Sequence, residues 1–232
     1  MLNTYNWYLV PVANPDGYEY SIHSSRMWRK NRSAHPTSYF CVGIDLNRNF
    51  DSKFRQVGVS SNCHSDIYPG ITAFSEAETQ NLRDLVVDRK DKVVAYLGVH
   101  AYSQFLMVSW GNVLGNSRPH NYVEIDRVGK KMQSALEGHG FRYEYGTVYQ
   151  LLDYAASGAS MDWVLEAKPN MYSYAYELRP DQRSNDGFNL PPRYIVSQGE
   201  EYFDSLAVMA KEMSVCRAGS GYEQCQSHAV VG

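Results

Sequence analysis

Two apolar segments constrain the fold of this chain more than any other feature of its sequence. Residues 93–99 read Val-Val-Ala-Tyr-Leu-Gly-Val, and residues 172–178 read Tyr-Ser-Tyr-Ala-Tyr-Glu-Leu. The first run is typical of a strand that is buried on both faces, as in a parallel sheet. The second is rich in tyrosine, which favours strands, and it predicts another central strand.

Amphipathic segments alternate with these strands. Helices are expected after the capping-box pattern Ser75-Glu76-Ala77-Glu78, over residues 119–137, after Ser160, and over residues 199–213. Their apolar faces are expected to carry Leu82, Leu85 and Val86 in the first, Ile125, Val128, Met132 and Ala135 in the second, and Phe203, Leu206, Ala210 and Met213 in the last. The alternation predicts an α/β fold with a mixed, largely parallel central sheet flanked by helices.

The two ends of the chain carry different signals. Residues 5–12 are rich in aromatic and β-branched residues and predict a buried strand, which Asn14-Pro15-Asp16-Gly17 should end in a turn. Residues 18–65 are expected to be rich in loops. Because termini usually begin with dispensable residues, a chain that opens almost directly on a core strand is expected to lack the start of its domain. Residues 215–232 lose the apolar periodicity and predict a tail.

Charge and composition exclude two classes of partner. Twenty-two Lys and Arg against 25 Asp and Glu give a net charge of −3, whereas a nucleic-acid protein needs a basic surface. No apolar run reaches the roughly 18 residues of a membrane-spanning helix. We therefore expect neither nucleic acid nor membrane as a partner.

The cysteines lie in two closely spaced pairs. Cys41 and Cys63 flank a loop-like stretch, and Cys216 and Cys225 lie in the predicted tail. Two local disulfides in an oxidising compartment are expected, and the alternative is four unpaired thiols in a cytosolic protein. The first residues do not have the pattern of a signal peptide. Secretory chemistry without a secretory signal again indicates a missing N-terminal part.

Ionisable residues occur where open α/β sheets bind ligands, beyond the carboxyl ends of the strands. His100 ends the first predicted strand, and Glu177 lies at the end of the second. Arginines occur in the loop-rich region, and an arginine fork holds a carboxylate with two hydrogen bonds. These residues suit an anionic substrate and proton transfer. The alternatives are a structural histidine, an ion pair of Glu177 with Arg179, and a solvated basic loop, which we prefer for Lys30 and Arg32.

Six ordered motifs make the chain similar to a known family. They are VPVANPDGYEYS, RMWRKNRS, GIDLNRNF, GVHAYSQ, YAASGASMDW and YSYAYELR, and the match runs from about residue 5 to residue 213. In this order they resemble the catalytic domain of the zinc metallocarboxypeptidases of the carboxypeptidase A/B family. The resemblance implies that residues 1–214 are the C-terminal part of such a domain. It also implies a secreted protein that is monomeric when complete, and a disulfide between Cys41 and Cys63.

The resemblance implies a role for each matched residue. His100 matches the third zinc ligand of the family. Glu177 matches the general base that activates the zinc-bound water, and Arg29 matches the arginine that polarises the scissile carbonyl. Asn47 and Arg48 match the clamp for the C-terminal carboxylate of a peptide. Tyr154 matches a mobile tyrosine that closes over that carboxylate. Arg26 matches a residue of the outer substrate path, and Tyr102 and Phe188 match subsite residues.

The pocket for the C-terminal side chain is also implied by matched positions. They are Met107, Gly111, Tyr149, Ala156, Met161 and Ala175, and together they predict a preference for apolar or aromatic C-terminal residues. Members that remove Lys or Arg have an acidic residue where this chain has Met161. Asp153 is a complication because it can edge the same pocket, where an unpaired carboxylate is unfavourable. We expect it to turn to water or to accept a basic side chain.

One family motif is missing from the sequence. The first two zinc ligands of the family come from an H-x-x-E motif that precedes the region matched here. None of the seven histidines has Glu three residues later. Catalytic zinc normally needs three protein ligands, and this chain supplies one, His100. Two hypotheses follow: a secreted zinc carboxypeptidase represented by a truncated, inactive chain, or a metal-free module that binds peptide C-termini.

Overall fold

A four-stranded sheet forms the centre of the molecule. The computed structural model describes residues 3–35, 38–89, 92–115 and 117–219. In the sheet, the strand order is β3-β6-β4-β5, formed by β3 (Ala95–Ser103), β6 (Tyr172–Asp181), β4 (Phe105–Val108) and β5 (Glu144–Thr147). β3 pairs with β6 and β4 with β5 in parallel, whereas β4 and β6 are antiparallel. The predicted mixed, largely parallel sheet is confirmed.

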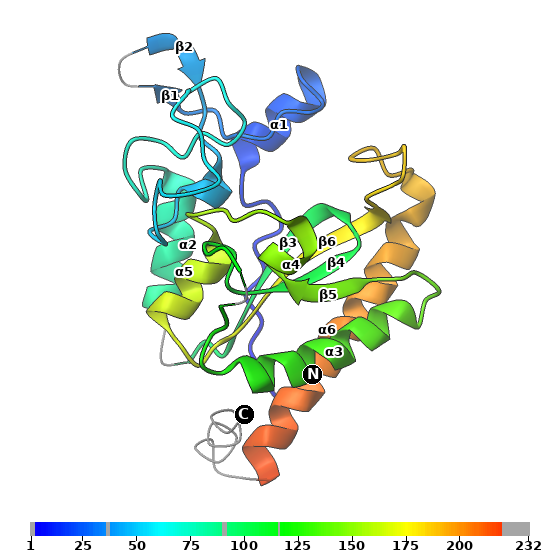
Figure 1. Cartoon of the computed structure of the whole chain (residues 1–232). Helices are drawn as coiled ribbons and strands as arrows, with labels where there is room; N and C mark the ends of the chain where they lie inside the picture. The colour runs from blue at the N-terminus through cyan, green and yellow to red at the C-terminus, as the bar shows by residue number, and fades with distance from the viewer. Residues whose placement is uncertain (1–2, 36–37, 90–91, 116, 220–232) are drawn as a thin grey trace.

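Helices cover both faces of this sheet (Figure 1). α3 (Tyr122–Glu137) and α6 (Ile195–Gly219) lie side by side along one face, and α2 (Ala77–Val87) and α5 (Ser160–Ala167) lie on the other side. The shorter elements are α1 (Pro15–His23), α4 (Val148–Leu152) and the 3-10 turns η1 (Leu46–Arg48) and η2 (Pro192–Tyr194). A two-stranded sheet of β1 (Ala34–His35) and β2 (Ser38–Val42) stands apart from the main one.

Alternation along β4 and β6 divides the core into two parts. Tyr174 donates its hydroxyl to the Ile125 carbonyl on α3 at 2.9 Å, whereas Ser173 donates to the Met161 carbonyl on α5 at 3.0 Å. The larger cluster includes Leu106, Val108, Ile125, Val128, Met132, Tyr174, Tyr176, Leu206 and Met209, together with Trp163, Val164 and Leu165 of α5. The smaller cluster consists of Phe105, Met107, Val148, Ala159, Met161 and Ala175. Period-two side-chain placement thus divides the side chains of β4 and β6 between the two clusters.

The first predicted strand differs from expectation in its burial. β3 begins at Ala95 and runs to Ser103, and it forms one edge of the sheet. Its residues are half-buried, and Val99 is 48% exposed. The prediction that residues 93–99 are buried on both faces was therefore wrong. β3 is an edge strand, and no other described strand pairs with its outer edge. The strand predicted at Tyr172 is confirmed and extends to Asp181.

The N-terminal predictions are also corrected. Residues 5–12 form no strand, and Leu9 is 79% exposed, although Tyr5 and Trp7 pack against the larger cluster. The expected turn at Asn14 is instead the start of α1, where the Asn14 side chain accepts a hydrogen bond from the Gly17 N–H at 3.0 Å. Asparagine and proline favour a helix start as strongly as a turn, so the local pattern was ambiguous.

The four helices that the sequence predicts are all present. α2, α3, α5 and α6 occur in the predicted segments, and Ile125, Val128 and Met132 are fully buried. The capping box at Ser75 does not form: the N-cap is Glu76, to which Ser75 donates, and the Glu78 carboxylate accepts from Asn31 instead. Phe203 is 56% exposed, so it does not belong to the buried face of α6. That helix continues to Gly219, beyond the predicted boundary at residue 214.

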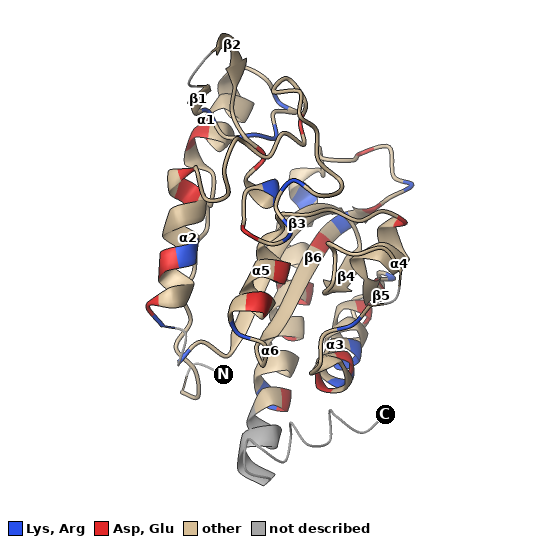
Figure 2. Ribbon diagram, turned by 60° about the vertical axis from the view of Figure 1, so that its left-hand side comes forward, with Lys and Arg blue, Asp and Glu red and all other residues tan. Residues whose placement is uncertain are grey.

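The described residues confirm one predicted disulfide, between Cys41 and Cys63, whose Cα atoms are 5.5 Å apart. The side chain of Cys216 and all of Cys225 lie outside the described residues. No described helix has the length and apolar character needed to cross a membrane. Acidic and basic residues are interspersed along α2 and α3 (Figure 2).

Candidate active site

The parallel pairing of β3 and β6 places two of the predicted site residues opposite each other. His100 on β3 is in register with Glu177 on β6. Both residues lie toward the carboxyl ends of their strands, where ligands bind in open sheets. The sequence could indicate each position separately, and the register of the sheet brings them together.

His100 is a neutral imidazole at neutral pH. Burial lowers the pKa of His100 to about 4, and the nearby Arg29 contributes in the same direction. The ring lies over Gly98, where an added Cβ would be 3.3 Å from the His100 Nε2 atom. A neutral ring nitrogen is the form of histidine that binds a metal ion.

Glu177 is a carboxyl group whose proton affinity suits a general base. Burial raises the pKa of Glu177 to about 7, against the opposing effect of Arg29. A base whose pKa lies near the working pH is available as the carboxylate and still accepts a proton strongly.

Asp45 organises the basic residues of the site, and sequence reasoning missed it. Its Oδ2 atom accepts from Nε and Nη2 of Arg29, both at 2.9 Å, and its Oδ1 atom accepts from the Asn47 N–H at 3.1 Å. The Nη1 atom of Arg48 is 4.0 Å from the same carboxylate. Three predicted residues are therefore linked through one carboxylate. The available signal was its place before LNR, where Asp is a good N-cap for the turn η1.

Asn47 and Arg48 are held firmly on this turn. The Asn47 side chain accepts from the Ser160 N–H at 3.1 Å, which ties η1 to the start of α5. Arg48 is buried and donates from Nε to the Gly58 carbonyl at 3.1 Å and from Nη1 to its neighbour's carbonyl at 2.9 Å. Among the described residues, its Nη2 group has no hydrogen-bond partner. The turn thus holds the Arg48 guanidinium in a fixed position and leaves its Nη2 group available to donate hydrogen bonds to a ligand.

The predicted outer residues form a separate, exposed group. Arg26 donates to the Phe188 carbonyl at 2.7 Å, and the Phe188 ring meets the Tyr102 ring edge-to-face with centroids 4.8 Å apart. Tyr154 is 45% exposed and follows α4. Its hydroxyl and Glu177 both act electrostatically on Arg29, so these three side chains lie in one neighbourhood.

Three of the six predicted pocket positions fall in the smaller core cluster. They are Met107, Met161 and Ala175, and Ala156 is buried as well. Asp153 is exposed and adopts a left-handed conformation, with φ of 53°, at the end of α4. Its carboxylate therefore does not lie buried in the apolar lining.

The described residues do not complete a catalytic zinc site. The one group of three potential ligands that they bring within 4.8 Å consists of Cys41, Cys63 and His64, and both sulfur atoms of this group are in the disulfide. His100 belongs to no such group within the described part of the chain. A single imidazole does not supply the three protein ligands that catalytic zinc normally takes.

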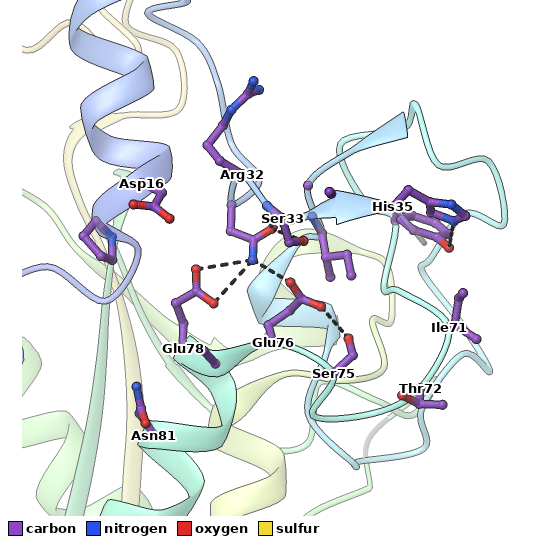
Figure 3. A pocket seen from close by; sticks show the side chains of 17 residues that line it. Asp16, Arg32, Ser33, His35, Ile71, Thr72, Ser75, Glu76, Glu78 and Asn81 are labelled. Atoms are coloured by element: carbon purple, nitrogen blue, oxygen red, sulfur yellow. Dashed lines mark hydrogen bonds between the residues drawn. The ribbon is translucent and has the colours of Figure 1, made fainter. Parts of the chain in front are cut away.

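A hollow of about 720 Å³ lies between α1, α2 and the β1–β2 segment. Glu76 and Glu78 lie at its wall (Figure 3), and both carboxylates accept from the Asn31 side chain. Both carboxylates lie at the N-terminus of α2, where negative charge is favourable. Their position has a structural explanation, and none of the predicted site residues lines this hollow.

Comparisons with known proteins give the family. The zinc carboxypeptidase family profile matches residues 1–205. Zinc carboxypeptidase A 1 of Anopheles gambiae is 42% identical over 211 residues, which are 90% of this chain and 48% of that protein. Carboxypeptidase B of Astacus astacus is 38% identical over 211 residues, covering 90% and 68% respectively.

Solved structures agree with this assignment. Bovine thrombin-activatable fibrinolysis inhibitor, in complex with tick carboxypeptidase inhibitor, has a TM-score of 0.81 and 36% identity, covering 88% of this chain and 68% of that one. Carboxypeptidase A of Helicoverpa armigera has a TM-score of 0.79 and 31% identity, covering 90% and 51%. The chain spans about half to two thirds of the length of these relatives. It belongs to the zinc carboxypeptidase family.

Proposed function

We propose that this chain is the part of a zinc metallocarboxypeptidase that binds the substrate and carries the general base. The observation that carries the proposal is the linkage of Arg29, Asn47 and Arg48 through Asp45, beside the paired positions of His100 and Glu177. A peptide C-terminus presents a carboxylate next to a carbonyl, and this arrangement offers a donor group for each. The hydrolytic activity of the whole protein requires zinc ligands that the described residues do not provide.

The grip on the substrate is assigned to η1. Asn47 and the free donor group of Arg48 bind the C-terminal carboxylate, and Tyr154 covers it from the exposed side. A charge-assisted hydrogen bond to a fixed guanidinium contributes about 1.5–3 kcal/mol. Arg26, Tyr102 and Phe188 contact residues further from the C-terminus.

The chemical roles fall to Arg29 and Glu177. Arg29 stabilises the negative charge that develops on the scissile carbonyl oxygen, for which a cation in a preorganised position is effective. Glu177 accepts a proton from the attacking water, a role supported by its raised pKa. In the complete protein, His100 is the ligand that this chain contributes to the family's zinc.

The preferred C-terminal residue is apolar or aromatic. This is supported by the burial of Met107, Met161 and Ala175 in one cluster and by the exposure of Asp153. In a chain restored to full length, peptides ending in Phe or Leu should have the higher kcat/KM. A preference for Lys or Arg that Asp153→Ala abolishes would make Asp153 the specificity residue instead.

A secreted, monomeric protein is the setting that we propose. The disulfide between Cys41 and Cys63 supports an oxidising compartment, since such bonds are rare in the cytosol. Peptide and protein C-termini are the proposed partners.

The second candidate function is a metal-free module that binds peptide C-termini. The observation in its favour is that no set of zinc ligands occurs within the described residues, although the carboxylate grip does not need zinc. A binding module has little use for Glu177 or Arg29, so we prefer the first proposal.

Both candidates predict that the chain binds a free C-terminus, and this is the first test. Acetyl-Gly-Phe should bind in titration calorimetry, and its C-terminal amide should bind at least about tenfold more weakly, which corresponds to 1.4 kcal/mol. Arg48→Gln should abolish this difference, whereas Arg83→Gln on the distant helix α2 should keep it. Equal binding of acid and amide by the unaltered chain would overturn the carboxylate grip.

Turnover separates the two candidates. We expect this chain to hydrolyse no acyl dipeptide, with or without added zinc. Supplying the missing family segment with its H-x-x-E motif should restore hydrolysis if the chain is part of an enzyme. A folded, zinc-loaded chimera that binds the peptide but leaves it intact would favour the binding module.

A further inference from the structure

Asp162 is a buried carboxylate that the proposed chemistry does not use. It lies on α5 directly after Met161 and is fully buried. No Lys or Arg of the described residues forms an ion pair with it. Such a group is expensive to bury unless its oxygen atoms are satisfied by donors.

The donors come from the backbone that follows β4. The Gly111 N–H lies 3.1 Å from Oδ1 and 2.9 Å from Oδ2 of Asp162, and the Asn112 N–H lies 2.8 Å from Oδ2. One carboxylate therefore fixes two successive backbone amides. Because Asp162 is next to Met161 in the chain, its hydrogen bonds connect two predicted pocket positions, Met161 and Gly111.

The carbonyl group of Gly111 is also fixed by a hydrogen bond. It accepts from the N–H of Ala156, another predicted pocket position, at 2.8 Å. A Cβ added to Gly111 would lie 3.1 Å from Val148 Cγ2 and 3.4 Å from Asp162 Oδ2. The backbone at residue 111 is thus close to both neighbours, and a small shift of it would change the space between the pocket walls.

A second carboxylate of α5 supports the same segment. Glu166 accepts from the Asn112 side chain at 3.1 Å and from the Ser52 hydroxyl at 2.9 Å. This tie acts on the Asn112 side chain, whereas Asp162 acts on the backbone. Glu166 is therefore a useful comparison, since it anchors the same segment without touching Gly111.

We propose that Asp162 is a positioning residue for the specificity pocket. By holding the Gly111 and Asn112 amides against α5, it sets the separation of Gly111 from Met161 and so the fit of a large apolar C-terminal side chain. This inference rests on the proposed function of the pocket, and it adds a residue that acts through the backbone and does not touch the substrate.

The ionisation of Asp162 gives the proposal a distinctive readout. Burial raises the pKa of Asp162 to about 6, against the opposing effects of the Ser109 side chain and of the Gly111 and Asn112 N–H groups, and the charge of Glu166 on the same helix raises it further. Below this pH the carboxyl group is neutral and accepts the two amides more weakly. The pocket should therefore discriminate less well at pH 5 than at pH 8.

The experiment compares two ligands that differ only in the side chain that enters the pocket. Titration calorimetry gives the affinities of acetyl-Gly-Phe and acetyl-Gly-Gly, and their ratio measures what the pocket contributes. Both ligands share the carboxylate grip, so any titration of that grip cancels in the ratio. In the unaltered chain we expect the ratio to fall as the pH decreases through about 6.

Three variants test the assignment. Asp162→Ala leaves two buried amides without a partner, and we expect the Phe-to-Gly ratio to fall about tenfold while the Gly-ended ligand binds as before. Asp162→Asn keeps an oxygen acceptor but not the charge, so its ratio should match that of the unaltered chain at pH 5 and no longer change with pH. Glu166→Gln should keep the ratio at pH 8, and the fall in the ratio should move to lower pH because the charge of Glu166 no longer raises the pKa of Asp162.

The outcomes are separable. Failure of the unaltered chain to bind either ligand would overturn the proposed function, and this inference with it. If the chain binds both ligands but Asp162→Ala weakens them equally or not at all, only the inference is overturned. Should Asp162→Ala fail to fold, as judged by near-UV circular dichroism, the pH series with Asp162→Asn decides, because an unchanged pH dependence in that variant would contradict the proposal.

Discussion

The face of the sheet that packs against α3 and α6 differs in kind from the end of β3 and β6 that carries His100 and Glu177. On the packing face, Leu106, Ile125 and Tyr174 are fully buried, and the tyrosine hydroxyl has a backbone acceptor. At the strand ends, the pKa values of the histidine and the glutamate are displaced by burial. The first region stabilises the fold at any pH. The second holds ionisable groups in buried surroundings that disfavour their charged forms.

The difference separates residues whose identity is explained by packing from residues whose identity is explained by chemistry. A buried apolar side chain lowers the free energy of the folded state simply by leaving water. A buried ionisable group raises that free energy unless it is paired, so its presence needs another reason. Substitutions in the two regions test this contrast.

The largest effect is expected on the packing face. Leu106 lies on β4 and is fully buried, so Leu106→Ala should lower the free energy of unfolding by about 2–5 kcal/mol through lost burial and a cavity. Denaturant unfolding at pH 5 and pH 8 should give the same loss at both values. Val87→Ala, at a position 47% exposed, is the control and should change little. A loss at Leu106 that depends on pH would break the contrast between the regions.

A change of opposite sign is expected at Glu177. Its pKa is raised to about 7 in the folded state from 4.5, so the folded state binds the proton more tightly than the unfolded state does. Stability from this group is present below pH 4.5 and is lost as pH rises through about 7. Glu177→Gln should therefore stabilise the chain at pH 8, by about 3 kcal/mol, and hardly at pH 4.

The measurement is the free energy of unfolding of both chains at several pH values. The Glu177→Gln chain should have the flatter profile between pH 5 and pH 8. If the variant is less stable than the unaltered chain at pH 8, the carboxylate is satisfied by its surroundings and the region is not destabilised by its chemistry.

The sequence predicted most of the framework and the separate parts of the site. Apolar patterns located α3, α6 and β6, because a buried stripe or strand leaves its mark within one segment. The motifs located Arg29, Arg48 and Glu177 in the same way. The Asp45 carboxylate, which links Arg29 to Asn47 and Arg48, was missed because Arg29 lies 16 residues away and only the fold brings the two together.

Local patterns failed where the outcome depends on a neighbour in space. Residues 5–12 have strand propensity but no strand beside them in the described structure, and such propensity is decided by packing. Asn14 and Pro15 suit both a turn and a helix start, and here they begin α1. The burial of Asp162 could not be read from its place in a polar-looking motif, since the amides that bind it are about fifty residues away.

A smaller effect is expected at Asp45. Asp45→Asn keeps the shape but removes the charge that accepts two donors from Arg29, which is itself 41% exposed and so partly screened by water. We expect about 1 kcal/mol of lost stability, and a larger loss of affinity for acetyl-Gly-Phe because Arg29 and Asn47 lose their common anchor. Asp84→Asn, which removes an exposed ion pair with Arg83, is the control. Unchanged ligand affinity in Asp45→Asn would show that the site does not depend on this carboxylate.

The smallest effect is expected from zinc. His100 offers a neutral nitrogen, but one imidazole binds a metal ion weakly because affinity comes from several ligands acting together. After dialysis against zinc and then buffer, the oxidised chain should hold far less than one zinc per molecule, and its thermal midpoint should be unchanged by the metal. His100→Ala should give the same zinc content, since no tight site is lost. The opposite result is about one zinc per molecule in the unaltered chain and loss of that zinc in His100→Ala. That result would show that the residues of this chain alone form a metal site at this end of the sheet. The strand ends would then differ from the packing face in binding an ion as well as in carrying ionisable groups.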